Sequence, residues 1–141
     1  MSIKTISKII IAYTLLLFSV HCYADDEEYA IPDELYVIFE ESGFDDVELD
    51  ESMIKGSSLI IIFSDFNLKY NRYLNAVRAV CSEVQKDKDF LNDYEIDEIV
   101  AQNLMESVQA VFKDASKNCL LMPKDNNKNF IDDHTIMVKL K

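Results

Sequence analysis

Two long stretches of the chain repeat apolar residues every three or four positions, which is the spacing of one face of an α-helix. The first stretch follows Gly56 and runs to about Lys86. Its apolar stripe consists of Leu59, Phe63, Phe66, Tyr70, Tyr73, Leu74, Val77, Val80, Cys81 and Val84. The run Leu59 to Phe63 is continuously apolar and could equally be a buried strand, whereas the spacing from Asn67 onward predicts helix.

The second stretch predicts another long helix, from about Asp93 to Asn118. Its stripe consists of Ile96, Ile99, Val100, Asn103, Leu104, Val108, Val111, Phe112 and Ala115. Four acids crowd the predicted first turns, where the positive end of the helix dipole favours them. Pro123 prevents the helix from continuing.

Shorter elements flank these two stretches. Pro32 and the acids that follow it predict a helix start, and Gly43 predicts its end, with Phe44 able to fold back on the last turn. The alternation in 135–140 predicts a short strand. The whole chain contains only two glycines and two prolines, which favours helices over a many-turned β fold. We therefore expect a mainly α fold: one domain, residues 25–141, with two long amphipathic helices and room for a minor β element.

The N-terminus has the three parts of a secretory signal peptide. Lys4 and Lys8 precede an uncharged, mostly apolar run from Ile9 to Val20, and small residues precede a cleavage site between Ala24 and Asp25. The apolar run is shorter than the ~20 residues that a membrane-spanning helix needs. We therefore expect cleavage after Ala24, export to the periplasm or, as the alternative, secretion from a eukaryotic cell, and no membrane attachment of the mature chain.

The charge of the mature chain is concentrated near its start. Cleavage would leave 12 basic and 26 acidic residues, and Asp25 to Glu51 holds 13 of the acids and no Lys or Arg. This balance argues against nucleic acid or anionic lipid as a partner, because both attract positive charge. Apolar residues within the same stretch favour a folded acidic face over a disordered tail. A basic protein is the expected partner.

Two cysteines remain after cleavage, Cys81 and Cys119. An even pair in an oxidising compartment predicts a disulfide. In a simple hairpin of the two long helices these residues would lie about 30 Å apart at ~1.5 Å rise per residue, so either the thiols are free or the hairpin is not simple. A catalytic thiol would require a histidine partner, and the mature chain offers only His134 in a polar stretch.

No catalytic or metal-binding signature stands out. Asp46, Glu48 and Asp50 alternate as in a calcium loop, but Glu51 replaces its required glycine and Ser57 its final acid. One histidine and two distant cysteines do not match a zinc site, and no nucleophile elbow or phosphate loop is present. We expect no cofactor and no enzymatic activity, and instead a protein that binds another protein.

The precursor resembles the pesticin immunity family in its signal MSIKTISKIIIAYTLLLFSVHCYA and in the acidic segment DDEEYAIPDELYVIFEESGFDDVELDE that follows. The resemblance implies binding to a bacteriocin that cuts peptidoglycan, and neutralisation of that toxin in the periplasm by occlusion. The alternative class is a general periplasmic chaperone or stress protein.

The candidate contact residues lie in the acidic stretch. Two apolar residues are candidate anchors, and five acids around them are a candidate steering rim: Phe44 and Val47, with Asp45, Asp46, Glu48, Asp50 and Glu51. Buried anchors hold a complex together, whereas rim charges raise its association rate. For Phe44 the alternative is a structural role, in which it caps its own helix.

Overall fold

The computed structural model of the chain describes residues 27–44 and 51–140. The predicted signal peptide, residues 1–24, and its cleavage site between Ala24 and Asp25 lie outside the described residues. The segment 45–50 does so too.

Six strands of the described residues form one sheet. They are β1 (Glu28–Ala30), β2 (Met53–Lys55), β3 (Ser58–Phe63), β4 (Glu98–Asn103), β5 (Val108–Phe112) and β6 (Thr135–Lys139). The strands lie in the sheet in the order in which they occur in the chain. Neighbouring strands are antiparallel except β3 and β4, which are parallel.

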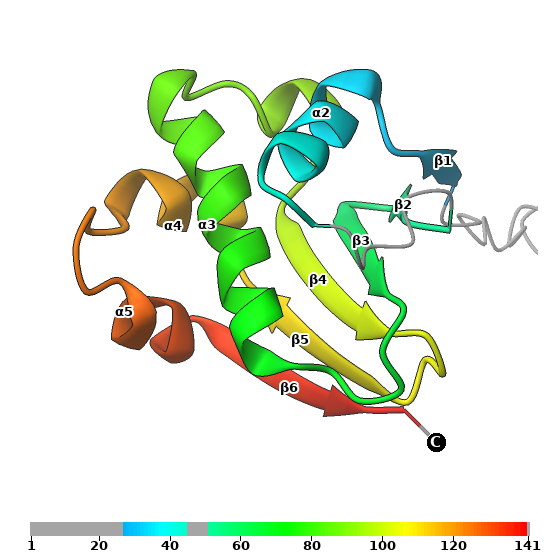
Figure 1. Ribbon diagram of the computed structural model, residues 1–141. Coiled ribbons are helices and arrows are strands. Elements are labelled where there is room, and N and C mark those ends of the chain that lie inside the picture. Colours follow the sequence, from blue (N-terminus) through cyan, green and yellow to red (C-terminus); the bar gives the residue numbers. More distant parts are fainter. Residues whose placement is uncertain (1–26, 45–50, 141) are drawn as a thin grey trace, which may run out of the picture.

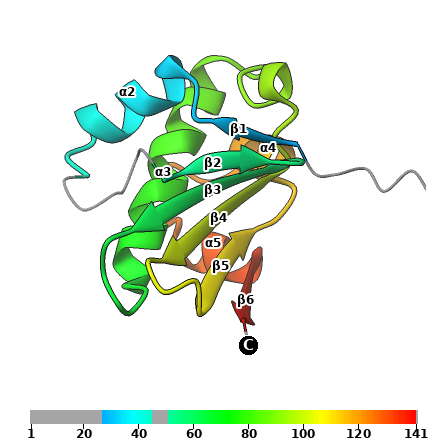
Figure 2. The same ribbon diagram turned by 90° about the vertical axis from the view of Figure 1, so that its right-hand side faces the viewer.

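The helices pack on one face of this sheet (Figures 1 and 2). They are α2 (Asp33–Glu41), α3 (Tyr70–Lys86), α4 (Ala115–Leu121) and α5 (Lys128–Asp133), with a 3-10 helix, η1, at Asn92–Tyr94. The longest, α3, connects the parallel strands β3 and β4 and crosses the sheet, with α2 on one side and α4 and α5 on the other (Figure 1). Alternate residues of the central strands, such as Leu59 and Ile61, meet these helices in the core.

The expected mainly α fold is therefore wrong: three of the six strands, β1, β2 and β3, lie before α3, and the first predicted long helix is helical only from Tyr70. The largest error lies in the second predicted long helix. Residues 93–118 form η1, β4, β5 and the first turn of α4 instead of a long helix. Five consecutive residues of β4, from Ile99 to Asn103, are buried. A strand that is buried on both faces does not alternate apolar and polar residues, so its sequence lacks the usual pattern of a strand. The hairpin loop 104–107 then joins two strands whose apolar residues continue the spacing of three or four by coincidence.

Other predicted elements are confirmed. The helix after Pro32 is α2, and Gly43 beyond its end has a positive φ of 72°, a conformation that glycine adopts at little cost. Helix α3 begins at Tyr70 and ends at Lys86, and the C-terminal strand is β6. For residues 59–63, where helix and strand were both open, the structure shows strand β3.

The predicted disulfide is present and joins Cys81 of α3 to Cys119 of α4, with the two Cα atoms 4.6 Å apart. The 30 Å separation expected for a two-helix hairpin does not arise, because the chain returns through two strands before α4. Both cysteines are fully buried in the core. Their bridge therefore ties α3 to the segment that follows β5.

Candidate partner-binding surfaces

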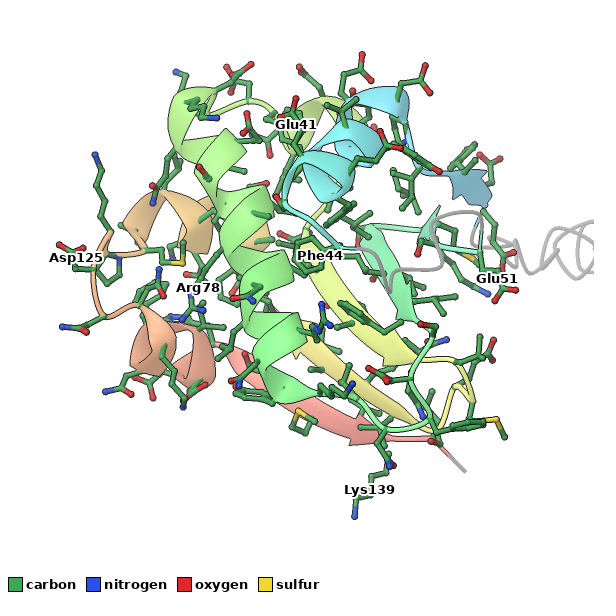
Figure 3. All side chains as sticks on the ribbon, in the orientation of Figure 1. Glu41, Phe44, Glu51, Arg78, Asp125 and Lys139 are labelled. Atoms are coloured by element: carbon green, nitrogen blue, oxygen red, sulfur yellow. A yellow bond between two sulfur atoms is a disulfide. The ribbon has the colours of Figure 1, made fainter. Side chains whose placement is uncertain are left out.

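The predicted anchor Phe44 lies in the core. Only 8% of it is exposed, and its ring contacts the rings of Phe39 and Phe63 at centroid distances of 5.9 and 6.4 Å. Its backbone N–H donates to the carbonyl of Phe39, as expected of a residue that closes a helix. Figure 3 shows Phe44 beside α3, whereas Glu41 and Glu51 lie at the outside of the molecule. Phe44 therefore has the structural role and offers little surface to a partner.

Most of the other predicted contact residues lie outside the residues that the structure describes. Asp45, Asp46, Val47, Glu48 and Asp50 lie outside the described residues, and Glu51 is exposed. The remainder of the acidic stretch, residues 27–44, folds as β1 and α2. The described part of this stretch is thus a folded surface and not a tail.

Helix α2 presents an exposed acidic face, which we call the acidic helix face. It consists of four carboxylates around one apolar residue: Asp33, Glu34, Glu40 and Glu41 around Val37. No basic residue lies in the last turn of α2. Glu34 accepts a hydrogen bond from the Tyr94 hydroxyl at 3.0 Å, and partial desolvation followed by this bond raises the pKa of Tyr94 above its usual value. The acidic helix face is consequently anchored to η1 while its carboxylates remain in solvent.

The opposite end of the sheet carries exposed apolar side chains on two loops, which we call the apolar tip. Phe66 lies in the loop between β3 and α3 and is 74% exposed, while Met105 lies in the β4–β5 hairpin loop and is 62% exposed. Leu104 beside it is also exposed. Because β3 and β4 are parallel, the loops that follow them leave the sheet at the same end. Exposed apolar residues on two adjacent loops make this end of the sheet a candidate interaction site.

Buried Asn103 holds the two loops of the apolar tip together. Its side-chain amide donates to the carbonyl of Phe66 at 2.6 Å and to the Ser107 hydroxyl at 2.9 Å. Its side-chain oxygen accepts from the backbone N–H groups of Ser107 and Val108, both at 3.0 Å. These four bonds use both donors and both acceptor positions of the amide. A further bond runs from the Leu104 N–H to the Asp65 carbonyl, so the loops form one preorganised unit.

Sequence reasoning missed the apolar tip because it assigned Phe66, Asn103 and Leu104 to the stripes of two helices. One signal was available: Asn103 is a polar residue in an otherwise apolar stripe. A buried amide needs several partners, and such partners are more readily supplied by a loop than by the apolar face of a helix.

An open groove of about 710 Å³ lies between α3 and the segment after α4. Its lining includes Arg78, Gln85 and Met122, and no carboxylate, histidine or cysteine. Gln85 donates to the backbone carbonyls of Cys119 and Met122, so its amide is engaged in the fold. Within residues 27–44 and 51–140, no cluster of histidine, cysteine or carboxylate residues could hold a metal ion.

The disulfide indicates that the protein resides in an oxidising compartment outside the cytoplasm. In the part of the chain that the structure describes, no helix has the length and apolar character to cross a membrane. Comparisons with protein-family models, with curated proteins and with solved structures find no significant match. The acidic helix face and the apolar tip are therefore the features of the molecule that bear on its function.

Proposed function

We propose that this chain is a periplasmic immunity protein that binds a peptidoglycan-degrading bacteriocin and neutralises it by occlusion. The observation that carries the proposal is the apolar tip, with Phe66 and Met105 exposed on loops fixed by Asn103. Phe and Met are enriched at the cores of protein–protein interfaces, and a few such side chains at the centre of an interface carry most of its binding energy. Its loops are ordered before binding, so little conformational entropy is lost when a complex forms.

The class of partner follows from three further features. The resemblance of the precursor to the pesticin immunity family suggests a toxin that cuts peptidoglycan. The predicted signal peptide and the disulfide agree with encounter in the periplasm, where such a toxin acts. Loops that project from the end of a sheet suit a concave target, and the substrate cleft of a glycan-cleaving enzyme is concave.

The acidic helix face would act before contact. Exposed charges of one sign accelerate the encounter with an oppositely charged protein while contributing little to the lifetime of the complex. A cationic bacteriocin would thus be attracted by α2 and held by the apolar tip.

The binding test compares two double variants with matched exposure. Replacing Phe66 and Met105 by Ser should weaken binding to the purified bacteriocin about 30-fold or more, because hot-spot truncations cost ~2 kcal/mol or more. The control replaces Leu120 and Leu121 of α4 by Ser, since Leu121 is 61% exposed and Met105 62%. Isothermal titration calorimetry gives both affinities. Equal weakening by the two variants would show that the tip has no special role, and absence of any complex would reject the proposed function.

The cellular test asks in which compartment the protein meets the bacteriocin. Cells that produce the full precursor should survive added bacteriocin, whereas cells that produce only residues 25–141 in the cytoplasm should be killed. Survival of both would place the encounter elsewhere.

A general chaperone remains the alternative function, and it makes a different prediction. A chaperone would suppress the aggregation of unrelated unfolded proteins through an adaptable apolar surface, as promiscuous binders do. The fixed loops of the tip favour one partner of defined shape. A stable one-to-one complex with the bacteriocin, together with no effect on the aggregation of an unrelated denatured enzyme, distinguishes the two.

A further inference from the structure

Strand β6 forms an open edge of the sheet. Among the described residues, no strand pairs with its outer side, and Figure 2 shows β6 at the border of the sheet. The Lys113 N–H donates to the His134 carbonyl, and the Leu140 N–H donates to the Ser107 carbonyl. In an antiparallel pair such bonds alternate along the strand, so even-numbered residues of β6 bond to β5. The backbone groups of Thr135, Met137 and Lys139 therefore point outward.

The other edge of the sheet is better protected than β6, whose single charged residue is Lys139 at its end. Strand β1 has only three residues, includes Glu28 in an ion pair with Lys55, and is followed closely by Pro32. Short length, charge and proline are the features by which proteins block unwanted strand pairing. Strand β6 has five residues, and its Ile136 and Met137 are each 53% exposed. An apolar, regular edge of this kind is suited to pairing.

We propose that a second copy of this chain pairs with β6, antiparallel, with Met137 opposite Met137 of that copy. This register places each outward residue opposite another outward residue, Thr135 opposite Lys139 and Met137 opposite itself. All three outward residues of each strand then exchange backbone hydrogen bonds. Shifting the register by two residues in either direction leaves an outward residue of β6 without a partner in the opposite β6. The sequence of the edge is thus self-complementary about a two-fold axis.

The side chains of this register match on both faces. On the face away from the helices, the strand pairings align one apolar row across the whole sheet: Ala30, Met53, Ile60, Val100, Val111 and Ile136. The proposed pairing sets Ile136 opposite Val138 of the second copy and so extends this row. On the helix face it brings the two Met137 side chains together. Neither face places like charges directly opposite each other, a pairing that would be destabilising.

This dimer goes beyond the proposed function and does not depend on it. Each apolar tip lies near the C-terminal end of β6, because Leu140 bonds to Ser107 of the hairpin. Antiparallel strands point in opposite directions, so the two tips would lie at opposite ends of the joint and remain accessible.

The test uses the position at which a residue faces its own counterpart. The mature protein should be a dimer by analytical ultracentrifugation, and Met137→Lys and Met137→Glu should each be monomeric because two like charges would meet. An equimolar mixture of the two variants should recover a dimer that contains one chain of each. Met105→Lys is the matched control, since Met105 is similarly exposed on the tip, and it should remain dimeric.

A second variant shows whether loss of the dimer could result from misfolding instead of from loss of strand pairing. Met137→Pro removes an outward N–H that β5 does not use, and proline is tolerated at such edge positions. This variant should keep the circular-dichroism spectrum of the wild type and be monomeric. A wild-type protein that is monomeric up to millimolar concentration would overturn the proposal, as would a dimer that survives Met137→Lys.

Discussion

The two ends of the sheet present opposite kinds of surface. At one end, α2 exposes four carboxylates around Val37, and at the other end two bonded loops expose Phe66, Leu104 and Met105. Figure 3 shows the labelled Glu41 and Lys139 at these opposite ends. Charge acts over about a Debye length, ~8 Å at physiological salt, whereas apolar contact acts only once water has been excluded. The molecule therefore separates a surface that affects the rate of encounter from one that affects the lifetime of a complex.

The largest expected effect concerns the disulfide, which stabilises the fold that carries both surfaces. Replacing Cys81 and Cys119 by Ala should lower the free energy of unfolding by about 4 kcal/mol, because the bridge closes a loop with a sequence separation of 38. Urea denaturation measures the loss. Binding measured under conditions where the variant is folded should be unchanged, since neither surface contains a cysteine. An unchanged denaturation midpoint would mean that the disulfide adds nothing to the stability of the fold.

A smaller effect, confined to one end, is expected for Asn103. Replacing Asn103 by Ala removes the acceptor of the Ser107 and Val108 N–H groups and the donor to the Phe66 carbonyl. Ser107 and Phe66 are exposed, so water can bond to the groups left behind. At a net ~0.5–1.5 kcal/mol for each of the three lost partners, stability should fall by about 2–4 kcal/mol, and affinity for the bacteriocin should fall with it.

Asn118 provides the control for this prediction. It is also buried, and its amide donates to the Lys113 carbonyl, away from the tip. Asn118→Ala should destabilise the protein while leaving binding intact. Comparable losses of affinity in the two variants would show that binding follows general stability and not the order of the tip.

The acidic end should affect the association rate alone. Replacing Asp33, Glu34, Glu40 and Glu41 by Asn or Gln should slow association with a cationic bacteriocin about 10-fold at low salt, and the difference should vanish as salt rises. Melting should change little, because relief of like-charge repulsion offsets the loss of the two first-turn acids, Asp33 and Glu34, and of the charged acceptor for Tyr94. Stopped-flow association across a salt series measures the effect.

A second set of substitutions locates the steering charge within the acidic stretch. It neutralises the acids that the sequence predicted as a rim: Asp45, Asp46, Glu48, Asp50 and Glu51. If neither set changes the rate at low salt, the acidic surface only maintains solubility and the partner approaches from elsewhere.

The smallest expected effect concerns two tyrosine–carboxylate hydrogen bonds, Tyr70 to Asp132 near the apolar tip and Tyr94 to Glu34 at the acidic helix face. Near the tip, Tyr70 donates to Asp132, and burial followed by this bond raises the pKa of Tyr70 to about 12. The unfolded chain ionises tyrosine near its ordinary value of 10.0, so the unfolded state loses the proton first. Stability should therefore decline between pH 10 and 12. The decline of stability with pH should be shallower in the Tyr70→Phe variant than in the Tyr94→Phe variant. Denaturation across alkaline pH measures both.

How far the sequence predicts this fold depends on whether an element is buried on one face or two. Helices α2 and α3 each have one apolar face and one solvent face, so their period is visible in the residues. Strand β4 is buried on both faces, and nothing in its order of residues distinguishes Ile99 and Val100 on opposite faces of a strand from neighbours on a helix. The β-branched residues of β4 and β5 were the available warning.

The candidate site was predictable only in part. The acidity of residues 25–51 is a property of composition and could be recognised without coordinates, and part of it forms the acidic helix face. The apolar tip depends on two loops that lie 37 residues apart in sequence, the separation of Phe66 and Asn103. Only the parallel pairing of β3 with β4 brings them together, and that pairing could not be inferred once β4 was taken for helix.

The sequential order of the strands also bears on how the chain folds. Only β2 with β3 and β4 with β5 pair across short turns, so these two hairpins can form without waiting for a distant part of the chain. The longest step is the docking of β4 against β3 through α3, where Ser58 meets Glu98 across 40 residues. Strands β1 and β6 also join across intervening helices, with Glu28 opposite Lys55 and Val108 opposite Lys139. Loop closure of this kind is what slows folding, so we expect the two hairpins to form first and the crossover β3–α3–β4 to limit the folding rate.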